Sequence, residues 1–316
     1  MHIRILLAFL FLFSLSTDAA TQLLDWKNLS NPVYSKEGWS TKDATMTWHE
    51  PTETFYIFFS AFFFDEGRER CHVTGVRTRD FITFSDPLFI WSGIEEGWIG
   101  FCSPNLTRFN DRYVLTFNSW GDKKGRANQL FYAESDNLEN WSAPKPLGSN
   151  VTNGHRAIDA AVYPFGDTVF LFWKLNQTPQ VSYAPSLASE QWKTLGNPGL
   201  GWFENAQLLN VDNEMYLVAT ARKHRQMLFK MDGDPANTWD WLKWNTVGEI
   251  LAPLESFNTD ERMNAGFLAD WRSFDGYFYY LYAGRTEGES HAGRGNQKLA
   301  LIRSQNLEDW VIPGQE

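Results

Sequence analysis

The chain has 316 residues, enough for one large domain, and its formal net charge is −10. This charge argues against a nucleic-acid partner, because the phosphate backbone is bound by basic surfaces. Aromatic residues make up 16% of the chain and include 15 Trp, which is typical of β-rich proteins and of proteins that stack sugars on aromatic rings. Most of these rings are expected to pack between sheets.

The N-terminal segment has the features of an export signal. Arg4 precedes an apolar run from Ile5 to Leu15 that is too short to span a bilayer, and Ala19 and Ala20 offer a cleavage site. We therefore predict a signal peptide over residues 1–20, a single mature domain over 21–316, and a secreted or periplasmic location. No second apolar run reaches spanning length, so no membrane span is expected in the mature chain.

A short motif recurs five times at a spacing of roughly 50 to 65 residues. It consists of a charged or amide-containing turn followed by an aromatic residue. The five aromatic residues are Phe84, Trp141, Trp192, Trp244 and Trp310. Each copy is surrounded by short alternating strands, a pattern typical of propeller blades. We therefore predict an all-β fold, a five-bladed β-propeller with four-stranded antiparallel blades.

The predicted blades span about residues 40–95, 98–150, 155–198, 202–252 and 262–313. Their inner strands are expected to begin near Asp43, Ser103, Asp159, Glu204 and Asn264. One blade cannot bury both of its faces alone, whereas five blades around an axis bury them all. Residues 21–39 either run along the outside or close the ring with a strand of the last blade.

Three acidic residues occupy nearly the same position in three of the repeats. Asp43, Asp159 and Glu204 each open an inner strand, and an aromatic strand follows 11 to 13 residues later. Equivalent positions in a radial array lie at one height around its axis, so the three carboxyl groups are expected to converge. One such acid alone is best explained as a satisfied turn carboxylate. Three at matched positions favour the cleavage of a glycosidic bond.

These segments resemble glycoside hydrolase family 43, whose members are five-bladed propeller glycosidases. The resemblance covers nearly the whole mature chain. It rests on four segments, one in each of the first four blades: Lys42-Asp43-Ala44-Thr45, Ser103-Pro104-Asn105-Leu106, Ala157-Ile158-Asp159-Ala160 and Phe203-Glu204-Asn205-Ala206. The resemblance implies that Asp43 is the general base, that Asp159 tunes a pKa, and that Glu204 is the general acid.

The chemistry of an inverting glycosidase fits these assignments. One carboxylate activates water while an opposing carboxylic acid protonates the leaving oxygen. A nearby negative charge helps that acid to keep its proton, which is the role expected of Asp159. We therefore predict a glycosidase that acts on oligo- or polysaccharides by an inverting mechanism. The alternatives are a catalytically inactive carbohydrate-binding propeller, a protein scaffold, and a retaining propeller glycosidase.

The chain departs from the family pattern at positions that bear on substrate and metal. Family members often carry Pro directly after each Asp, where this chain has Ala44 and Ala160. They often carry Gly-Pro after the acid, where this chain has Asn205-Ala206. These changes are typical of a divergent member and do not favour the usual pentose substrates. The blade 5 segment at 263–266 lacks the His that often lies near the axis, and no His/Cys cluster has metal spacing. No cofactor is predicted, with an axial calcium ion as the alternative that the family offers.

Other side chains near the inner strands are candidates for binding the sugar. Arg285, at the end of a blade 5 strand, could bind a carboxylate, and His155 and Arg156 could line the mouth of the site. The aromatic candidates are Trp48, Phe101, Trp120 and Trp202, although core packing is the simpler explanation for each ring taken singly. The two cysteines, Cys71 and Cys102, form either one disulfide or two buried thiols.

Overall fold

The computed structural model describes residues 23–109, 111–121, 125–221, 223, 225–259, 264–286 and 296–315. The predicted signal peptide therefore lies outside the described residues. Within the described ranges, no helix combines the length and the apolar character needed to cross a membrane.

The described part of the chain is built from antiparallel blades whose strands follow one another outward from an inner strand. Blade 1 contains β1 (Ser40–His49), β2 (Thr54–Asp65), β3 (Arg68–Thr78) and β4 (Ile90–Trp91). Blade 2 contains β5 (Gly100–Phe109), β6 (Arg112–Trp120), β7 (Leu130–Ser135) and β8 (Lys145–Pro146). Blade 3 contains β9 (Ala157–Phe165), β10 (Thr168–Leu175), β11 (Thr178–Ala184) and β12 (Lys193–Gly196).

The remaining two blades complete the set. Blade 4 contains β13 (Phe203–Val211), β14 (Glu214–Ala221), β15 (Gln226–Met231) and β16 (Trp244–Ile250). Blade 5 contains β17 (Asn264–Asp270), β18 (Phe278–Gly284) and β19 (Lys298–Ser304). The described helices are single turns: α1 (Ser149–Thr152), α2 (Arg272–Asp275) and the 3-10 segments Glu50–Thr52 and Thr238–Leu242.

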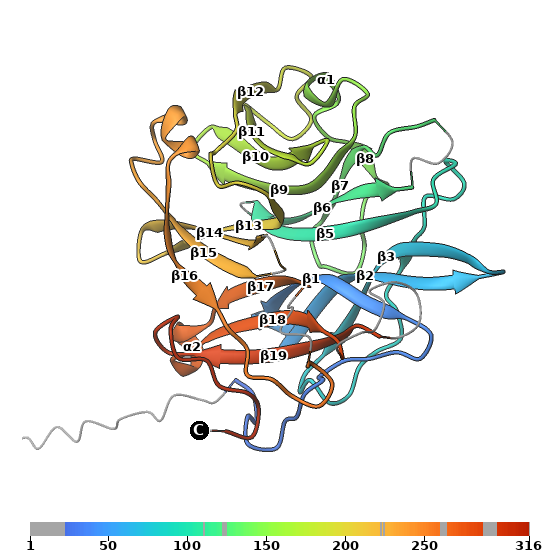
Figure 1. The fold of residues 1–316 in the computed structure, drawn as a ribbon, viewed down its shortest axis with the longest axis vertical. Helices are drawn as coiled ribbons and strands as arrows, with labels where there is room; N and C mark the ends of the chain where they lie inside the picture. The colour runs from blue at the N-terminus through green and yellow to red at the C-terminus, as the bar shows by residue number, and fades with distance from the viewer. Residues whose placement is uncertain are drawn as a thin grey trace, which may run out of the picture.

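The blades follow one another around a common centre (Figure 1). The chain passes from the blue and cyan strands on the right, through the green strands of blade 3 at the top and the yellow and orange strands of blade 4 on the left, to the red strands of blade 5 at the bottom. Each inner strand contacts the next in the order β1, β5, β9, β13, β17, and β17 contacts β1. The predicted five-bladed β-propeller is confirmed.

The segment before β1 pairs with a strand of blade 5, which is the second of the two arrangements predicted for residues 21–39. Tyr34 and Leu299 of β19 exchange two backbone hydrogen bonds of 3.2 and 2.9 Å. The Asn31 side chain donates to the Leu301 carbonyl and accepts from the Leu301 N–H. These bonds cover the outer edge of β19, and they tie the beginning of the described chain to its last blade.

All five inner strands carry a β-bulge at the same height. The register of each inner strand shifts where one residue adopts the left-handed backbone conformation. These residues are Asp43 (φ 53°), Ser103 (57°), Asp159 (58°), Asn205 (48°) and Ala265 (41°). The repeat in the sequence is therefore a repeat of backbone geometry. In blade 4 the equivalent residue is Asn205, so Glu204 stands one residue before the position that Asp43 and Asp159 occupy.

The recurrent turn motif has a hydrogen-bonding basis. The side chains of Asp80, Asn137 and Asn306 each accept the backbone N–H groups of the residues two and three positions later. Such side-chain bonds fix a turn locally. The aromatic residue after the turn then packs inward: the Trp141 ring, for example, contacts Phe58 of blade 1 with centroids 5.3 Å apart.

Three details differ from the prediction. Within the described residues blade 5 has three strands, because its outer edge is covered by single bridges at Tyr34–Leu299 and Arg303–Val311 instead of a fourth strand. Blades 1 and 2 share one sheet through a parallel pair between Cys71 and Gly100. The sequence predicts the second strand of blade 1 over residues 54–61, but β2 runs to Asp65 and forms a long hairpin with β3 on the right of Figure 1.

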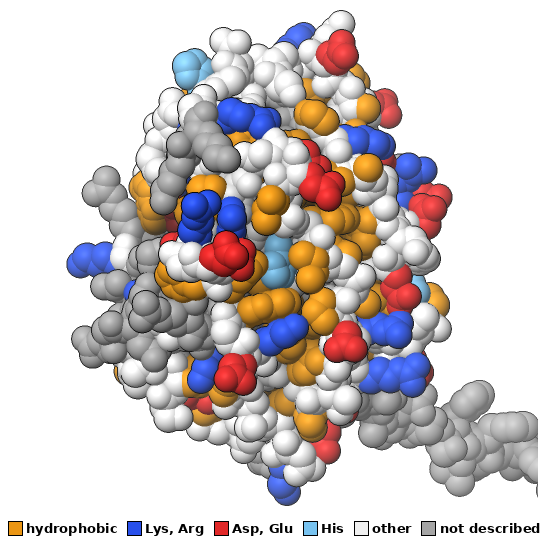
Figure 2. Space-filling view, turned by 90° about the vertical axis from the view of Figure 1, so that its right-hand side faces the viewer, with side chains coloured by type: hydrophobic (Ala, Val, Ile, Leu, Met, Phe, Trp, Pro, Cys, Tyr) orange, Lys and Arg blue, Asp and Glu red, His pale blue; other side chains and the backbone are white. Residues whose placement is uncertain are grey.

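Aromatic rings fill the space between neighbouring blades, as predicted. Phe170 of blade 3 and Trp241 of blade 4 stack with centroids 3.8 Å apart. The surface is different: on the face shown in Figure 2, basic and acidic side chains are interspersed, with hydrophobic side chains between them. No single sign of charge dominates that face.

The left-handed backbone at the bulges predicts that substitution by glycine there does not destabilise the protein. Ala265→Gly is expected to be neutral or stabilising by up to about 1 kcal/mol, because a Cβ is unfavourable at a φ of 41°. Ala269→Gly in the same strand is the matched control and should destabilise the protein by about 0.5–1 kcal/mol, the usual cost of glycine inside a strand. Urea denaturation measures both. Equal losses of unfolding free energy would contradict the strain assigned to the bulge.

Candidate active site

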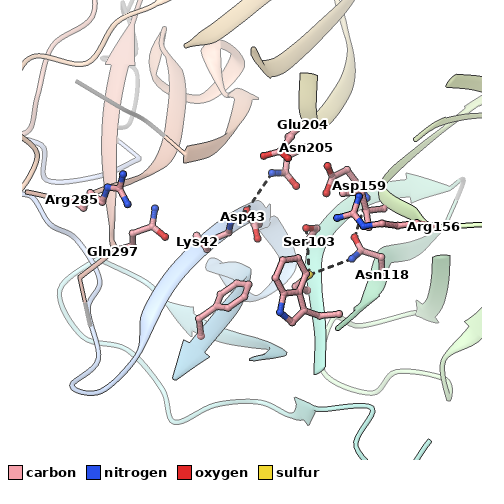
Figure 3. A pocket seen from close by; sticks show the side chains of 14 residues that line it. Lys42, Asp43, Ser103, Asn118, Arg156, Asp159, Glu204, Asn205, Arg285 and Gln297 are labelled. Carbon is pink, nitrogen blue, oxygen red and sulfur yellow. Dashed lines mark hydrogen bonds and ion pairs between the residues drawn. The ribbon is translucent and has the colours of Figure 1, made fainter. Parts of the chain in front are cut away.

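A cavity of about 240 Å³ opens where the inner strands β1, β5, β9 and β13 begin. Figure 3 shows its side chains: Arg285 and Gln297 lie on one side, Arg156 and Asn118 lie on the other, and the acids stand between them. The lining residues are Lys42, Asp43, Phe62, Cys102, Ser103, Asn118, Trp120, Arg156, Ile158, Asp159, Glu204, Asn205, Arg285 and Gln297. The structure thus brings the three predicted acids together in one cavity.

Asp43 is buried and held from three sides. Ser60 Oγ donates to its Oδ2 at 2.9 Å, and Asn205 Nδ2 of blade 4 donates to its Oδ1 at 3.2 Å. The Lys42 ammonium lies 3.4 Å from Oδ1. Burial raises the pKa of Asp43, while Lys42 and Ser60 oppose that rise. The result is a carboxyl group in a fixed orientation at the floor of the cavity.

Ser60 also connects Asp43 to the neighbouring blade. Its Oγ accepts a hydrogen bond of 2.8 Å from the backbone N–H of Ser103, the bulge residue of blade 2. The hydroxyl donates to Asp43 and accepts from Ser103, so the orientation of the acid depends on the alignment of blades 1 and 2. Asp43 is therefore positioned by three blades together.

Asp159 is buried on the opposite wall and is coupled to its neighbours by charge. Its backbone N–H donates to Asn118 Oδ1 at 3.0 Å. Its Oδ2 lies 3.5 Å from the Lys174 ammonium, an ion pair without hydrogen-bond geometry. Burial raises the pKa of Asp159 to about 6, with Lys174 opposing the rise and Glu204 adding to it. The expected repulsion between Asp159 and Glu204 is therefore present.

Glu204 is the most accessible of the three acids, with a side chain that is 24% exposed. Its Oε1 accepts a hydrogen bond of 2.8 Å from Lys174 Nζ. The Lys174 side chain is fully buried, and its ammonium lies 4.7 Å from the centre of the Trp202 ring. One buried cation thus bridges Glu204 and Asp159, and it stabilises the negative charge on both.

The role of Lys174 was not predicted, although the sequence carries a signal for it. Lys174 follows Phe170 and Phe172 at alternate positions in β10, and both rings are buried against blade 4. Alternate residues of a strand share a face, so the lysine had to point towards blade 4. A lysine on an apolar face needs a carboxylate partner, and Glu204 is the one available there.

The predicted sugar-binding residues are divided by the structure. Trp120 and Arg285 line the cavity. Trp202 lies behind Lys174, and His155 is exposed next to Arg156. Two predictions are corrected: Trp48 lies at the far end of β1, where it packs on Phe55, and Phe101 is buried between Phe117 and Phe131. In both cases the ring packs on aromatic rings of its own blade.

The two cysteines and the predicted alternative of a calcium ion both bear on the cavity. Cys71 and Cys102 are buried free thiols, and Cys102 lines the cavity. Among the described residues no group of three His, Cys, Asp or Glu side chains is arranged to hold a metal ion. Met263, the first residue of the blade 5 segment that the sequence analysis compared with the family's axial His, lies outside the described residues.

Comparison with known proteins gives a clear result for the fold. No protein-family model and no curated protein matches the sequence. Solved structures do match. A glycosyl hydrolase from Bacteroides ovatus aligns over 89% of this chain and 87% of its own, with a TM-score of 0.63 and 12% identity. A GH43_1 enzyme from Xanthomonas citri aligns over 92% and 96%, with a TM-score of 0.62 and 15% identity.

A third match comes from a different family. The GH62 α-L-arabinofuranosidase domain of Coprinopsis cinerea aligns over 88% of this chain and 96% of its own, with a TM-score of 0.60 and 16% identity. These likenesses show that the chain has the propeller fold of glycoside hydrolases from families 43 and 62. They agree, at the level of the fold, with the resemblance drawn from the sequence.

The raised pKa of Asp159 predicts a pH-dependent cost to stability. In the unfolded chain the group ionises near 3.8, whereas in the folded protein it ionises near 6. The stability that this group contributes is therefore present below about pH 4 and is lost as the pH rises to about 6. Asp159→Asn avoids this loss and should raise the free energy of unfolding at pH 7 by up to about 3 kcal/mol.

Urea denaturation of both proteins between pH 4 and pH 7 measures this difference. The advantage of Asp159→Asn should grow up to about pH 6 and stay constant above it. An advantage that is the same at pH 4 and pH 7 would show that Asp159 ionises normally in the folded protein.

Proposed function

We propose that this protein is a glycoside hydrolase that cleaves glycosidic bonds in oligo- or polysaccharides. The observation that carries the proposal is the convergence of Asp43, Asp159 and Glu204, from three blades, on one cavity of a propeller fold. The Xanthomonas citri enzyme of the same fold was solved in complex with xylotriose, which supports a carbohydrate as the ligand class. The apolar N-terminal run supports a secreted or periplasmic location.

Asp43 has the environment of a general base. Ser60 and Asn205 hold its two oxygens, and Lys42 balances its charge in the ionised form. A carboxylate that is fixed at the cavity floor can take a proton from a water molecule as that water attacks the anomeric carbon. The fixed orientation lowers the entropy cost of reaching that geometry.

Glu204 has the environment of the group that meets the leaving oxygen. It is the most exposed of the three acids, so a glycosidic oxygen can reach it. Lys174 and Asp159 lie behind it and set its charge in opposite directions: Asp159 favours the protonated form and Lys174 the ionised form. In this proposal Asp159 controls proton delivery and does not touch the reacting atoms.

Substitution of the two reacting acids tests the proposal. Asp43→Asn and Glu204→Gln preserve size while they remove base and acid function, and each should lower kcat by about 10²- to 10⁴-fold. The assay is hydrolysis of a panel of aryl glycosides and of plant and algal polysaccharides. Circular dichroism provides the folding control. Full turnover in either variant would exclude that residue from the reaction.

The leaving group separates the two roles. Glu204→Gln should be impaired less on nitrophenyl glycosides than on natural linkages, because nitrophenolate departs with little help from a proton. Asp43→Asn should be impaired on both, because water must be activated in either case. Comparison of kcat/KM for the two substrate types in each variant measures the effect. The same dependence in both variants would overturn the assignment of acid and base.

The anomeric form of the first product tests the inverting mechanism. Proton NMR during early hydrolysis should show the anomer opposite to that of the substrate, because water attacks directly from the face opposite the leaving group. A product with the original configuration would show a retaining mechanism with a covalent intermediate.

A carbohydrate-binding propeller without activity is the second candidate, and one contact favours it. The bond of 2.8 Å from Lys174 stabilises the ionised form of Glu204, which opposes its action as an acid. Under this alternative the wild type and both acid variants bind the same glycan equally, and none of them hydrolyses any member of the panel. Isothermal titration calorimetry with the same polysaccharides distinguishes the two candidates.

A further inference from the structure

Several basic side chains of the described residues gather at the cavity. Lys42, Arg156 and Arg285 line it, and Lys174 lies buried directly behind Glu204. Among the described residues, four cations therefore accompany three carboxylates, in a protein whose overall charge is −10.

The two lysines are accounted for by the acids. Lys42 lies 3.4 Å from Asp43, and Lys174 lies within 3.5 Å of both Asp159 and Glu204. These two ammonium groups balance most of the negative charge of the three carboxylates. The guanidinium groups of Arg156 and Arg285 lie on opposite sides of the acids (Figure 3).

Arg156 is the cation whose bonding is incomplete. Its Nη1 is shielded from solvent and has no hydrogen-bond partner among the described residues, and the guanidinium forms no ion pair with any of them. The main chain holds the residue in place, because the Arg156 carbonyl accepts a bond of 2.9 Å from the Asn176 N–H. Arg156 lines the cavity and is only partly buried, so a ligand oxygen that enters the cavity can accept a hydrogen bond from its guanidinium.

The opposite wall carries the complementary kind of group. Gln297 is buried, and its Oε1 has no hydrogen-bond donor among the described residues. A carbonyl oxygen accepts from a hydroxyl group but repels an anion. The cavity therefore has an anion-accepting wall at Arg156 and a hydroxyl-accepting group at Gln297.

We propose that the sugar residue bound in this cavity carries an anionic substituent, and that Arg156 recognises this substituent. A carboxylate or a sulfate ester matches the forked geometry of a guanidinium, which forms two parallel charge-assisted hydrogen bonds with such groups. This inference rests on the proposed function and gives it a substrate class: uronic-acid or sulfated glycans.

Matched pairs of substrates test the proposal. One arm compares nitrophenyl uronides with the parent hexosides, and a second compares sulfated with desulfated galactan oligosaccharides. In the arm that matches the natural substituent, kcat/KM should be about 10- to 100-fold higher for the anionic member, as for a hydrogen bond to a charged group. The two arms distinguish a carboxylate from a sulfate.

Variants of Arg156 assign the preference to this residue. Arg156→Gln should bring the ratio of kcat/KM between the anionic and the neutral member close to one, mainly through KM, and Arg156→Lys should retain part of the preference. Arg108→Gln is the matched control, because Arg108 is exposed on β5 and lines a separate pocket beyond the bulge. It removes the same charge and should leave the ratio unchanged.

The outcomes separate this inference from the proposed function. Hydrolysis of neutral members only, or an unchanged ratio in Arg156→Gln, overturns the anionic substrate and leaves the glycosidase intact. If no member of any pair is hydrolysed, the glycosidase fails. Calorimetry of the wild type and Arg156→Gln with the same oligosaccharides then decides the inference: tighter binding of the anionic member that depends on Arg156 supports it, and equal binding of both members refutes it.

Discussion

The left-handed bulge at the start of every inner strand is the constraint on which the site depends. Without it, each inner strand would continue as a regular pleat, and successive side chains would alternate between the two faces of the blade. With it, the extra residue is turned out of the ladder, so Asp43 and Asp159 reach the cavity from the sheets that carry them. A backbone conformation that is uncommon for residues other than glycine recurs in five blades, and in four of them the residue that adopts it lines the cavity.

The site that results is a charged network inside a largely apolar ring. Each of the three carboxylates lies within 3.5 Å of one of two lysines, and all five groups are buried or half-buried. Buried charges of this kind are tolerated when they are paired and hydrogen-bonded. The residues that complete the network come from different blades: Ser60 from blade 1, Lys174 from blade 3 and Asn205 from blade 4. The chemistry of the cavity therefore depends on how the blades pack, because a shift of one blade would separate an acid on the next blade from its hydrogen-bond partners.

Lys174 changes the effect that Asp159 alone would have on the charge of Glu204. A carboxylate beside an acid favours the protonated form of that acid, and this would be the whole effect of Asp159 on Glu204 if no cation were present. The ammonium between them weakens that repulsion and adds an attraction of its own. The charge state of Glu204 therefore depends on a balance of two neighbours. A substrate with its own negative charge would enter that balance, which connects the acid-base chemistry to the cations on the cavity walls.

Much of the fold and part of the site could be predicted from the sequence, because they depend on local chemistry. The turn carboxamides and carboxylates at Asp80, Asn137 and Asn306 act within four residues, so their recurrence predicted the five blades and their limits to within a few residues. Asp43, Asp159 and Glu204 were found because repeats at one height place their residues around one axis. What only the tertiary structure decided were the contacts between blades. Nothing local distinguishes Trp48, which is half-buried against Phe55, or Phe101, which is buried in the core, from Trp120, which lines the cavity. The roles of Lys174 and Arg156 likewise depend on other blades, because Lys174 pairs with Glu204 of blade 4 and Arg156 has an N–H without a partner among the described residues. The free energy of a buried charge is set by its surroundings in space and not by its neighbours in sequence.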